Sequence, residues 1–172
     1  MFDVVVIGSG PAGYVAAIRA SQLGLKTLCI EELSNDKGKP NFGGTCLNVG
    51  CIPSKSLLDS SHRYYEAKKN LSDHGIPLGD VKLDLKTMME RKDNIVSKLT
   101  GGIDGLFLTN KVESICGKGK VISKNTVQID KADGSSEKVD AKNIIIATGS
   151  SPIEIPAANF GKHIVDSTGG LA

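Results

Sequence analysis

Two cysteines five positions apart are the residues whose type and spacing point most directly to chemistry in this sequence. Cys46 and Cys51 lie in the glycine-rich stretch GGTCLNVGCIPSK, at residues 43–55. A disulfide between them would close a ring so small that it removes only about 2 kcal/mol of unfolded-state entropy. Because so little stability would be gained, we interpret the pair as redox-active.

The residues that follow predict how this pair is positioned. Pro53 suits the first turn of a helix, because its φ angle is fixed near the helical value and its missing N–H would have no partner there. Cys51 is therefore expected at or just before the N-terminus of a helix. The helix dipole and the free N–H groups at that end favour a thiolate, and Lys55 adds a positive charge one turn further on.

A purely structural disulfide and half of a zinc site are the alternatives for this pair. A zinc site would need Cys29 and Cys116 as further ligands, but each stands in an apolar, strand-like run without a second close cysteine or histidine pair. Both are therefore expected to be small buried core residues. The sequence predicts no metal site.

A second motif lies at the N-terminus, where a predicted buried strand at residues 3–7 leads through a glycine-rich turn into a predicted helix at residues 14–23. Gly8 permits the tight turn, Gly10 lets the backbone approach a pyrophosphate, and Gly13 allows close packing of the helix. The N-terminus of that helix would face the phosphates. A strand before the glycines and a helix after them indicate a dinucleotide-binding turn.

The next predicted strand, at residues 26–30, ends at Glu31. A carboxylate at that place can accept hydrogen bonds from ribose hydroxyls. The neighbouring Glu32 is expected to face solvent. Residues 32–42 are polar and rich in turn formers, and they are predicted to form an exposed loop.

Two long helices are predicted in the middle of the chain, one continuing from Pro53 to about residue 71 and one over residues 85–109. Gly101 and Gly102 interrupt the second helix, and they predict close packing or a bend, with simple tolerance as the alternative. Apolar residues at three- and four-residue steps predict a core-facing side for the second helix: Leu85, Met88, Met89, Ile95, Val96, Leu99, Ile103 and Leu106.

The remainder of the chain changes towards β structure, and Asp133 with Gly134 marks a hairpin turn. The last predicted strand is continuously apolar, as in a buried parallel strand, and it ends in Thr148 and Gly149, where ligands gather in parallel sheets. The strands are predicted at residues 112–116, 120–123, 126–129, 137–140 and 143–147.

Composition sets broad limits on the function. The 172 residues, 40% apolar and 23% charged, suffice for one substantial core. The net charge of +2 decides nothing, but basic residues scattered without interleaved aromatic residues, and the absence of tryptophan, argue against nucleic-acid binding. No apolar run could span a bilayer, and no signal-type leader precedes the first strand. We therefore expect a cytoplasmic protein without membrane partners, and a reducing compartment agrees with a catalytic cysteine pair.

Three segments, VVVIGSGPAGYVAAIRA, GGTCLNVGCIPSK and NIIIATGSSP, resemble the pyridine nucleotide-disulfide oxidoreductase family over residues 3–172. Leu47, Ile52, Ser54 and residues 99–103 resemble the dihydrolipoamide dehydrogenases within it, whereas glutathione and mercuric reductases more often carry valine at the first two positions. The resemblance implies an α/β class, with a Rossmann-like FAD-binding fold built from a central parallel sheet, flanking helices and a small antiparallel β-meander. Residues 1–172 would form one FAD-binding domain.

The resemblance also implies which residues bind FAD. The first glycine-rich turn would hold the pyrophosphate, Glu31 the adenosine ribose and Gly119 the adenosine end, while the segment after the last strand would border the flavin. The cofactor-binding residues implied in this way are Gly8, Gly10, Pro11, Ala12, Gly13, Glu31, Gly44, Thr45, Cys46, Lys55, Gly119, Ala147, Thr148 and Gly149.

The same resemblance implies catalytic roles for the two cysteines. Cys46 would be the interchange sulfur that dihydrolipoamide attacks, and Cys51 would be the flavin-proximal sulfur. The residues agree with these roles, because exchange needs one accessible sulfur and one stabilised leaving thiolate, and Cys51, nearer the helix, is the more stabilised of the two. Electrons would pass through the flavin to NAD⁺. The implied partner is the lipoyl group of 2-oxoacid dehydrogenase complexes, and the parent enzyme would be a homodimer.

Part of the family pattern has no counterpart in these residues, since the NAD-binding, central and dimerisation domains are missing. The family's proton-transfer histidine belongs to that missing part, and no motif assigns its role to His62, His74 or His163. We therefore expect a fragment without complete turnover. The alternatives are a stand-alone flavin-binding module, a flavin module of the glutathione or mercuric reductase type, and a folded domain that holds no flavin.

Overall fold

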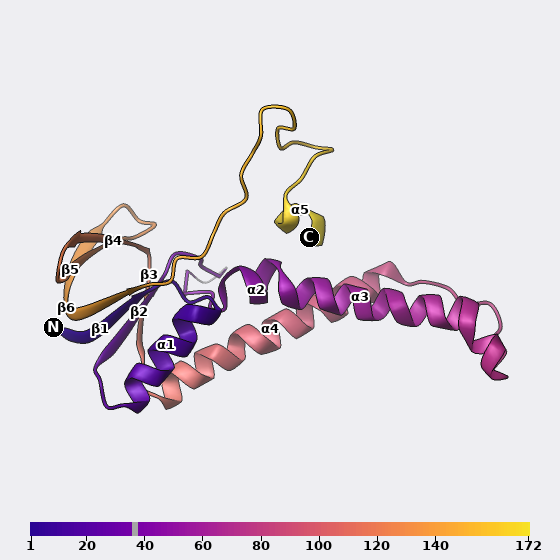
Figure 1. The fold of residues 1–172 in the computed structure, drawn as a ribbon, viewed down its shortest axis with the longest axis horizontal. Coiled ribbons are helices and arrows are strands. Elements are labelled where there is room, and N and C mark those ends of the chain that lie inside the picture. The colour runs from indigo at the N-terminus through magenta and orange to yellow at the C-terminus, as the bar shows by residue number, and fades with distance from the viewer. Residues whose placement is uncertain (36–37) are drawn as a thin grey trace.

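The computed structural model describes residues 1–35 and 38–172, and Figure 1 shows a sheet from which a long two-helix arm extends. The dinucleotide-type turn joins the first strand to the first helix, and the redox cysteines begin the arm. Along the chain the elements are β1 (Phe2–Ile7), α1 (Pro11–Gln22), β2 (Thr27–Glu31), α2 (Gly44–Val49), α3 (Cys51–Tyr65), the π-helix η1 (Glu66–Asn70), the 3-10 helix η2 (Leu71–His74), α4 (Leu85–Thr109), β3 (Glu113–Cys116), β4 (Lys118–Ser123), β5 (Thr126–Asp130), β6 (Ser136–Ile146) and α5 (Ser167–Leu171).

The six strands form one sheet in the order β3-β2-β1-β6-β5-β4. β3, β2, β1 and the second half of β6 run parallel, with Val5 of β1 opposite Leu28 on one side and Ile144 on the other. The first half of β6 pairs antiparallel with β5, and β5 pairs antiparallel with β4. This confirms the α/β class, the central parallel sheet and the antiparallel meander.

β6 corrects one expectation, because the two strands predicted at residues 137–140 and 143–147 are a single strand of eleven residues. Ala141 stands between the halves, is 1% exposed, and pairs with Phe2 of β1. No turn former separates the halves, so the strand leaves the meander and enters the parallel sheet without a break. The predicted hairpin turn lies where expected, since the N–H of Gly134 donates to the carbonyl of Lys131 between β5 and β6.

The parallel sheet is covered on both faces, which explains its continuously apolar strands. Because side chains alternate along a strand, neighbouring residues of β1 and β2 enter different cores. One core packs against the meander and contains Val5, Ile7, Leu28, Ile30, Val127, Ile129 and Ala141. The other packs against the helices and contains Val4, Val6, Ala17, Ala20, Cys29, Phe42, Leu47, Ile103, Phe107 and Val112.

The helix α4 is less buried than its apolar spacing predicts. Its C-terminal half lies under the sheet, where the ring of Phe107 packs 4.7 Å from that of Phe42, while its N-terminal half extends into the arm beside α3 (Figure 1). An element in the arm has only one neighbour, so its apolar side chains stay partly in water. Of the predicted set, Ile103 is buried, Met88, Met89, Ile95 and Val96 are half-buried, and Leu85, Leu99 and Leu106 are exposed.

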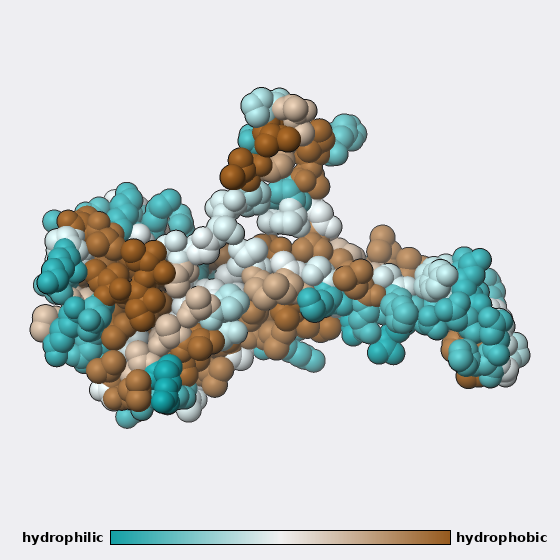
Figure 2. All heavy atoms as spheres, viewed as in Figure 1, coloured by the Kyte–Doolittle hydropathy of each residue, from teal (hydrophilic) through white to brown (hydrophobic). Residues whose placement is uncertain are grey.

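The two glycines of α4 are also explained by exposure. A Cβ atom on Gly101 or Gly102 would meet nothing within 4 Å, so the expected close packing is wrong and the helix tolerates both residues. The helix predicted to continue to residue 71 changes to the π-helix η1 after Tyr65 and then to η2. Figure 2 shows hydrophilic residues at this end of the arm.

The segment between the second strand and the redox cysteines follows its prediction in part. Ser34 forms an isolated bridge with Pro40, Phe42 is buried, and residues 36 and 37 lie outside the described part of the chain. Beyond β6 the chain leaves the sheet and returns as α5, which lies near α2 (Figure 1). Within the described residues, no helix is both long and apolar enough to cross a membrane.

Candidate functional site

A groove of about 600 Å³ lies at the carboxyl ends of β1, β2 and β6. Its walls are the β1–α1 turn, the residues after β2, the junction of α2 and α3, the turn before β4, and the segment after β6. Both predicted catalytic residues and eleven of the fourteen predicted cofactor residues line it: Gly8, Gly10, Pro11, Glu31, Gly44, Thr45, Cys46, Cys51, Gly119, Ala147, Thr148 and Gly149.

Three predicted residues do not line this groove. Ala12 and Gly13 belong to the first turn of α1 behind it, and Lys55 is exposed on α3. Other residues line the groove that the sequence analysis did not assign to it. They include Ser9, Glu32, Leu33, Gly50, Gly117, Lys118, Ser150 and Ser151. Ser9 could have been found, since it stands inside the glycine-rich turn.

Two glycines of the first turn, Gly8 and Gly13, occupy positions where the protein has no room for a side chain. Gly8 has a φ angle of +99°, and its Cβ would lie 2.3 Å from the carbonyl oxygen of Ala147. A Cβ on Gly13 would lie 1.9 Å from the carbonyl oxygen of Gly8. The fold itself therefore requires both glycines.

Gly10 is different, because the protein leaves room for a side chain there. Its φ angle is −63°, and a Cβ would meet only the Cα of Gly44, at an ordinary 3.9 Å. Gly10 lines the groove and caps α1, which begins at Pro11. The fold does not account for glycine at this position, whereas a ligand that contacts the backbone would.

Glu31 is held in the floor of the groove with 6% of its surface exposed. Its Oε2 accepts hydrogen bonds from the N–H of Ser9 at 2.8 Å and from the Ser9 hydroxyl at 2.5 Å. Its Oε1 accepts a third from the N–H of Leu33 at 2.8 Å. A carboxylate offers about four acceptor positions, so one on Oε1 stays open to a hydroxyl donor.

The redox segment packs directly on the dinucleotide-type turn. The N–H of Gly43 donates to the carbonyl of Ser9 at 3.0 Å. Gly44, with a φ angle of +57°, approaches Gly10 so closely that a Cβ on Gly44 would lie 2.7 Å from the Cα of Gly10. Two motifs separated by more than thirty residues therefore form one surface.

The two redox cysteines lie on consecutive short elements. Cys46 is half-buried in α2, and Cys51 is exposed as the first residue of α3, with only Gly50 between the helices. This confirms the predicted place of Cys51 at a helix N-terminus. Both side chains are free thiols, and together they can lose two electrons and two protons to form a disulfide.

Electrostatics distinguish Cys46 from an ordinary thiol. A side-chain hydrogen bond with Cys51 is the main cause that raises the pKa of Cys46, and burial raises it further. The Lys55 ammonium group lowers the same pKa by a smaller amount. Lys55 therefore acts on Cys46, although its side chain does not reach into the groove.

The two other cysteines lie outside the redox pair. Cys29 is fully buried in β2, as expected, and burial raises its pKa to about 12, with the Glu31 carboxylate as a second cause. Cys116 is only half-buried, so the expectation of a core residue is wrong for it, because β3 is an edge strand. In the described part of the chain, no group of three or more His, Cys, Asp or Glu residues could hold a metal ion.

Residues at β4 and after β6 form the opposite wall of the groove. The N–H of Ala147 donates to the carbonyl of Ile7 at 2.8 Å, which places Thr148 and Gly149 beside the glycine-rich turn. Gly119 lies so close to β1 that a Cβ would be 2.9 Å from Cγ2 of Ile7. At the rim, the ammonium group of Lys118 lies 3.3 Å from the carboxylate of Glu32. Glu32 is exposed, as expected, and it also borders the groove.

These features together fit an extended dinucleotide such as FAD. Space beside Gly10 admits a pyrophosphate at the N-terminus of α1, and the open acceptor position on Glu31 admits a ribose hydroxyl. The thiols of Cys46 and Cys51 lie in the same groove.

Curated relatives match almost the whole chain. A leghemoglobin reductase of Vigna unguiculata is 56% identical over 171 residues, which are 99% of this chain and 32% of that protein. Dihydrolipoyl dehydrogenase 1, mitochondrial, of Arabidopsis thaliana is 54% identical over the same shares. Dihydrolipoyl dehydrogenase, mitochondrial, of Bos taurus is 52% identical over 99% of this chain and 33% of that protein. The chain spans about a third of the length of these relatives.

The names of these relatives contradict one expectation. The Arabidopsis thaliana and Bos taurus proteins are called mitochondrial, so the expectation of a cytoplasmic protein is wrong. It rested on composition and on the lack of a leader. A folded domain carries no such information, because targeting signals are separate segments that are removed from the mature protein.

The family comparison agrees with the geometry of the groove. Residues 2–172 match the family described as pyridine nucleotide-disulphide oxidoreductase. Both the dinucleotide-type turn and the cysteine pair lie within the matched residues. This chain therefore belongs to the pyridine nucleotide-disulphide oxidoreductase family.

Proposed function

We propose that this chain is the FAD-binding and redox-disulfide part of a dihydrolipoamide dehydrogenase. The observation that carries the proposal is that one groove brings together the glycine-rich turn, Glu31 and the thiols of Cys46 and Cys51. The relatives named dihydrolipoyl dehydrogenase, at 54% and 52% identity, support this member of the family over a glutathione or mercuric reductase.

Different groove residues bind different parts of FAD. Gly8, Gly10 and the N-terminus of α1 hold the pyrophosphate, and Oε1 of Glu31 accepts a ribose hydroxyl. Gly119 borders the adenosine end, while Thr148 and Gly149 border the flavin half. When bound, FAD supplies a two-electron acceptor between the protein dithiol and NAD⁺.

The cysteine pair performs the exchange with the substrate. One thiolate of dihydrolipoamide attacks the sulfur of Cys46 in the protein disulfide, and Cys51 leaves as a thiolate. The second substrate thiolate then attacks the substrate sulfur of the mixed disulfide and releases Cys46. The products are lipoamide, which is oxidised by two electrons, and the protein dithiol, which is reduced by two.

The helix geometry supports this order of attack. Cys51 begins α3, where the helix dipole stabilises a leaving thiolate. The exposure of the two cysteines is opposite to what these roles predict. The attacked Cys46 is half-buried, whereas Cys51 is exposed. The assignment therefore rests on the leaving group and not on access.

The wider setting follows from the same assignment. The partner is the lipoyl group of 2-oxoacid dehydrogenase complexes, the final acceptor is NAD⁺, and the parent enzyme is a mitochondrial homodimer. The domains that bind NAD⁺ and form the dimer would belong to a longer protein, so residues 1–172 alone bind FAD and exchange thiols without complete turnover.

A spectroscopic titration tests this function. FAD is added to the protein, and binding is followed by the change in flavin fluorescence. Dihydrolipoamide is then added under anaerobic conditions to the oxidised protein, with glutathione as the competing reductant. We expect saturable FAD binding and faster reduction of the Cys46–Cys51 disulfide by dihydrolipoamide. Protein that never binds FAD would contradict the proposed function, and faster reduction by glutathione would favour a glutathione reductase.

A further inference from the structure

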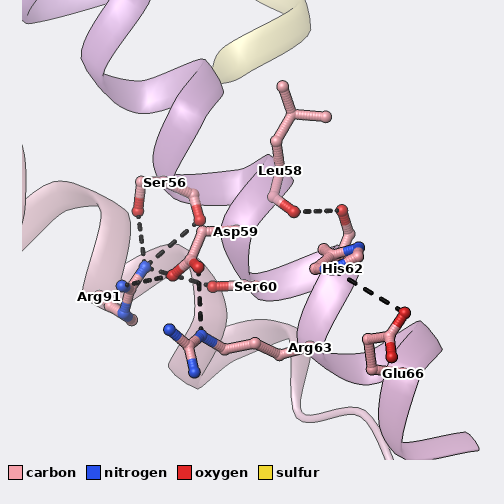
Figure 3. A network of polar contacts seen from close by, with 9 residues as sticks. Ser56, Leu58, Asp59, Ser60, His62, Arg63, Glu66 and Arg91 are labelled. Carbon is pink, nitrogen blue, oxygen red and sulfur yellow. Dashed lines mark hydrogen bonds and ion pairs between the residues drawn. The ribbon is translucent and has the colours of Figure 1, made fainter. Parts of the chain in front are cut away.

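The arm contains an arginine that connects the redox helix α3 to α4. Nη1 of Arg91 donates to the hydroxyl of Ser56 at 3.0 Å and to the hydroxyl of Ser60 at 3.3 Å, and Nη2 donates to Oδ2 of Asp59 at 3.0 Å (Figure 3). Nη1 also lies 3.3 Å from the carbonyl oxygen of Ser56. Asp59 and Ser60 follow Ser56 by three and four positions, so the three residues bound by Arg91 share one face of α3.

This contact lies close to the redox pair along the helix. Cys51 is the first residue of α3, and Ser56, which is 6% exposed, lies little more than one turn further on. Because only Gly50 separates α3 from α2, the position of α3 decides where Cys51 stands relative to Cys46. A disulfide forms only within a narrow range of Cα separations.

The helix α4, which carries Arg91, packs against the sheet at its C-terminal end. α4 is fixed to the helix-side core through Ile103 and Phe107. The residue after Arg91 makes a second connection, since the buried Lys92 donates from Nζ to the carbonyl of Leu171 in α5 at 2.7 Å. α4 therefore connects the sheet to α3, whose first residue lines the groove, and to α5.

The contact between Arg91 and Asp59 is an ion pair near the surface, with both side chains partly exposed. Arg63, on the same helix, lies 3.1 Å from Oδ1 of Asp59 and is the main cause that lowers the pKa of this carboxyl, and Arg91 lowers it further. Asp59 is therefore ionised at neutral pH. Arg63 binds the same carboxylate as Arg91 but connects α3 only to itself, so it serves as a matched control.

We propose that Arg91 is a positioning residue for the dithiol: by binding Ser56, Asp59 and Ser60 it holds the first turns of α3 where Cys51 meets Cys46. The inference rests on the proposed role of these cysteines as a redox pair. Arg91 touches neither sulfur and acts through the position of the helix. Loosening α3 lowers the effective concentration of one thiol at the other, which disfavours the disulfide.

The test is a redox equilibrium of the 172-residue protein in glutathione buffers. In the reaction, the protein dithiol and one oxidised glutathione give the protein disulfide and two reduced glutathiones. We expect Arg91→Ala to lower the equilibrium constant for oxidation by roughly 3- to 10-fold, in the range of coupling between contacting residues. Arg91→Lys should recover part of this loss, because it keeps the charge but not the planar fork.

Controls separate positioning from stability. Arg63→Ala should change the equilibrium constant by less than about twofold, since it breaks no contact between helices. Melting temperatures of all variants are measured in parallel. The inference is overturned if Arg91→Ala and Arg91→Lys lower the melting temperature but keep the wild-type constant. If the wild-type protein forms no Cys46–Cys51 disulfide at all, the redox assignment falls and this inference falls with it.

Discussion

The carboxylate of Glu31 and the side chain of Ser9 form one buried unit that spans the first two strands of the sheet. The N–H and the hydroxyl of Ser9 both donate to Oε2, at 2.8 and 2.5 Å, and Ser9 is fully buried. Oε2 is thereby fully used within the protein, and Oε1, which accepts only from the N–H of Leu33, keeps an open acceptor position. In the proposed function, the turn that binds the phosphates therefore also orients the acceptor for the ribose.

Ser9→Ala should weaken FAD binding without removing a contact to the ligand, because it removes one of the three hydrogen bonds that orient the Glu31 carboxylate. Losing a hydrogen bond to a charged group costs about 1.5–3 kcal/mol, so we expect affinity for FAD to fall by roughly one to two orders of magnitude. Fluorescence titration measures the affinity, and Ser97→Ala on the exposed side of α4 is the control. Equal affinities of Ser9→Ala and wild type would show that Ser9 does not orient Glu31.

Alanine substitutions separate the glycines that the fold requires from Gly10, which the proposed ligand requires. Gly10→Ala should fold normally, because its Cβ has room, but should weaken FAD binding by about 1–3 kcal/mol through overpacking against the ligand. Thermal melting and FAD titration measure the two effects. Gly101→Ala on the exposed part of α4 is the control for stability and should leave FAD affinity unchanged. Normal FAD affinity of Gly10→Ala would place the phosphates elsewhere.

Gly13→Ala should give the opposite result. Its Cβ would lie 1.9 Å from the carbonyl oxygen of Gly8, so the backbone of the turn must shift. We expect a loss of about 3 kcal/mol or more in the free energy of unfolding. Urea denaturation measures this loss, and a variant as stable as Gly10→Ala would contradict the packing described for α1.

Cys46→Ser should abolish thiol exchange with dihydrolipoamide and leave FAD binding intact, because the slightly smaller serine hydroxyl fits the same place but cannot form a disulfide. Mass spectrometry of the oxidised protein would then show no intramolecular disulfide at this site. Cys116→Ser is the matched control, since it removes a half-buried thiol outside the groove. Exchange that persists in Cys46→Ser would assign the attacked sulfur to another residue.

The pH dependence of alkylation tests the electrostatics of the pair. The raised pKa of Cys46 leaves less thiolate at a given pH, so its reaction with iodoacetamide should be slow near pH 8 and accelerate as the pH rises. Cys51→Ala removes the main cause of the shift, and the reactivity of Cys46 should then move to lower pH. Peptide mapping locates the modified thiol. An unchanged profile in Cys51→Ala would show that Cys51 is not the cause of the raised pKa of Cys46.

Cys29 provides an internal reference in the same experiment. Burial raises its pKa to about 12, so it should stay unmodified near pH 8 in the folded protein and react once the protein is unfolded in urea.

Local patterns in the sequence sufficed to predict much of this protein. The helix over residues 85–109 was predicted with the bounds that the structure has, and Cys51 was placed at a helix start through Pro53. The glycine-rich turn and the cysteine spacing identified the family that the comparison confirms. These features depend on neighbouring residues, because helix periodicity, turn geometry and ring size are short-range properties.

Tertiary structure decided the rest. Only folding brings Ser9 to Glu31, Gly44 to Gly10 and Arg91 to Ser56, since each contact joins residues of different elements. It also makes β6 one strand and leaves half of the apolar side of α4 near water in the arm. Apolar spacing predicts which side of a helix is turned inward, but burial depends on how much of the protein lies opposite that side.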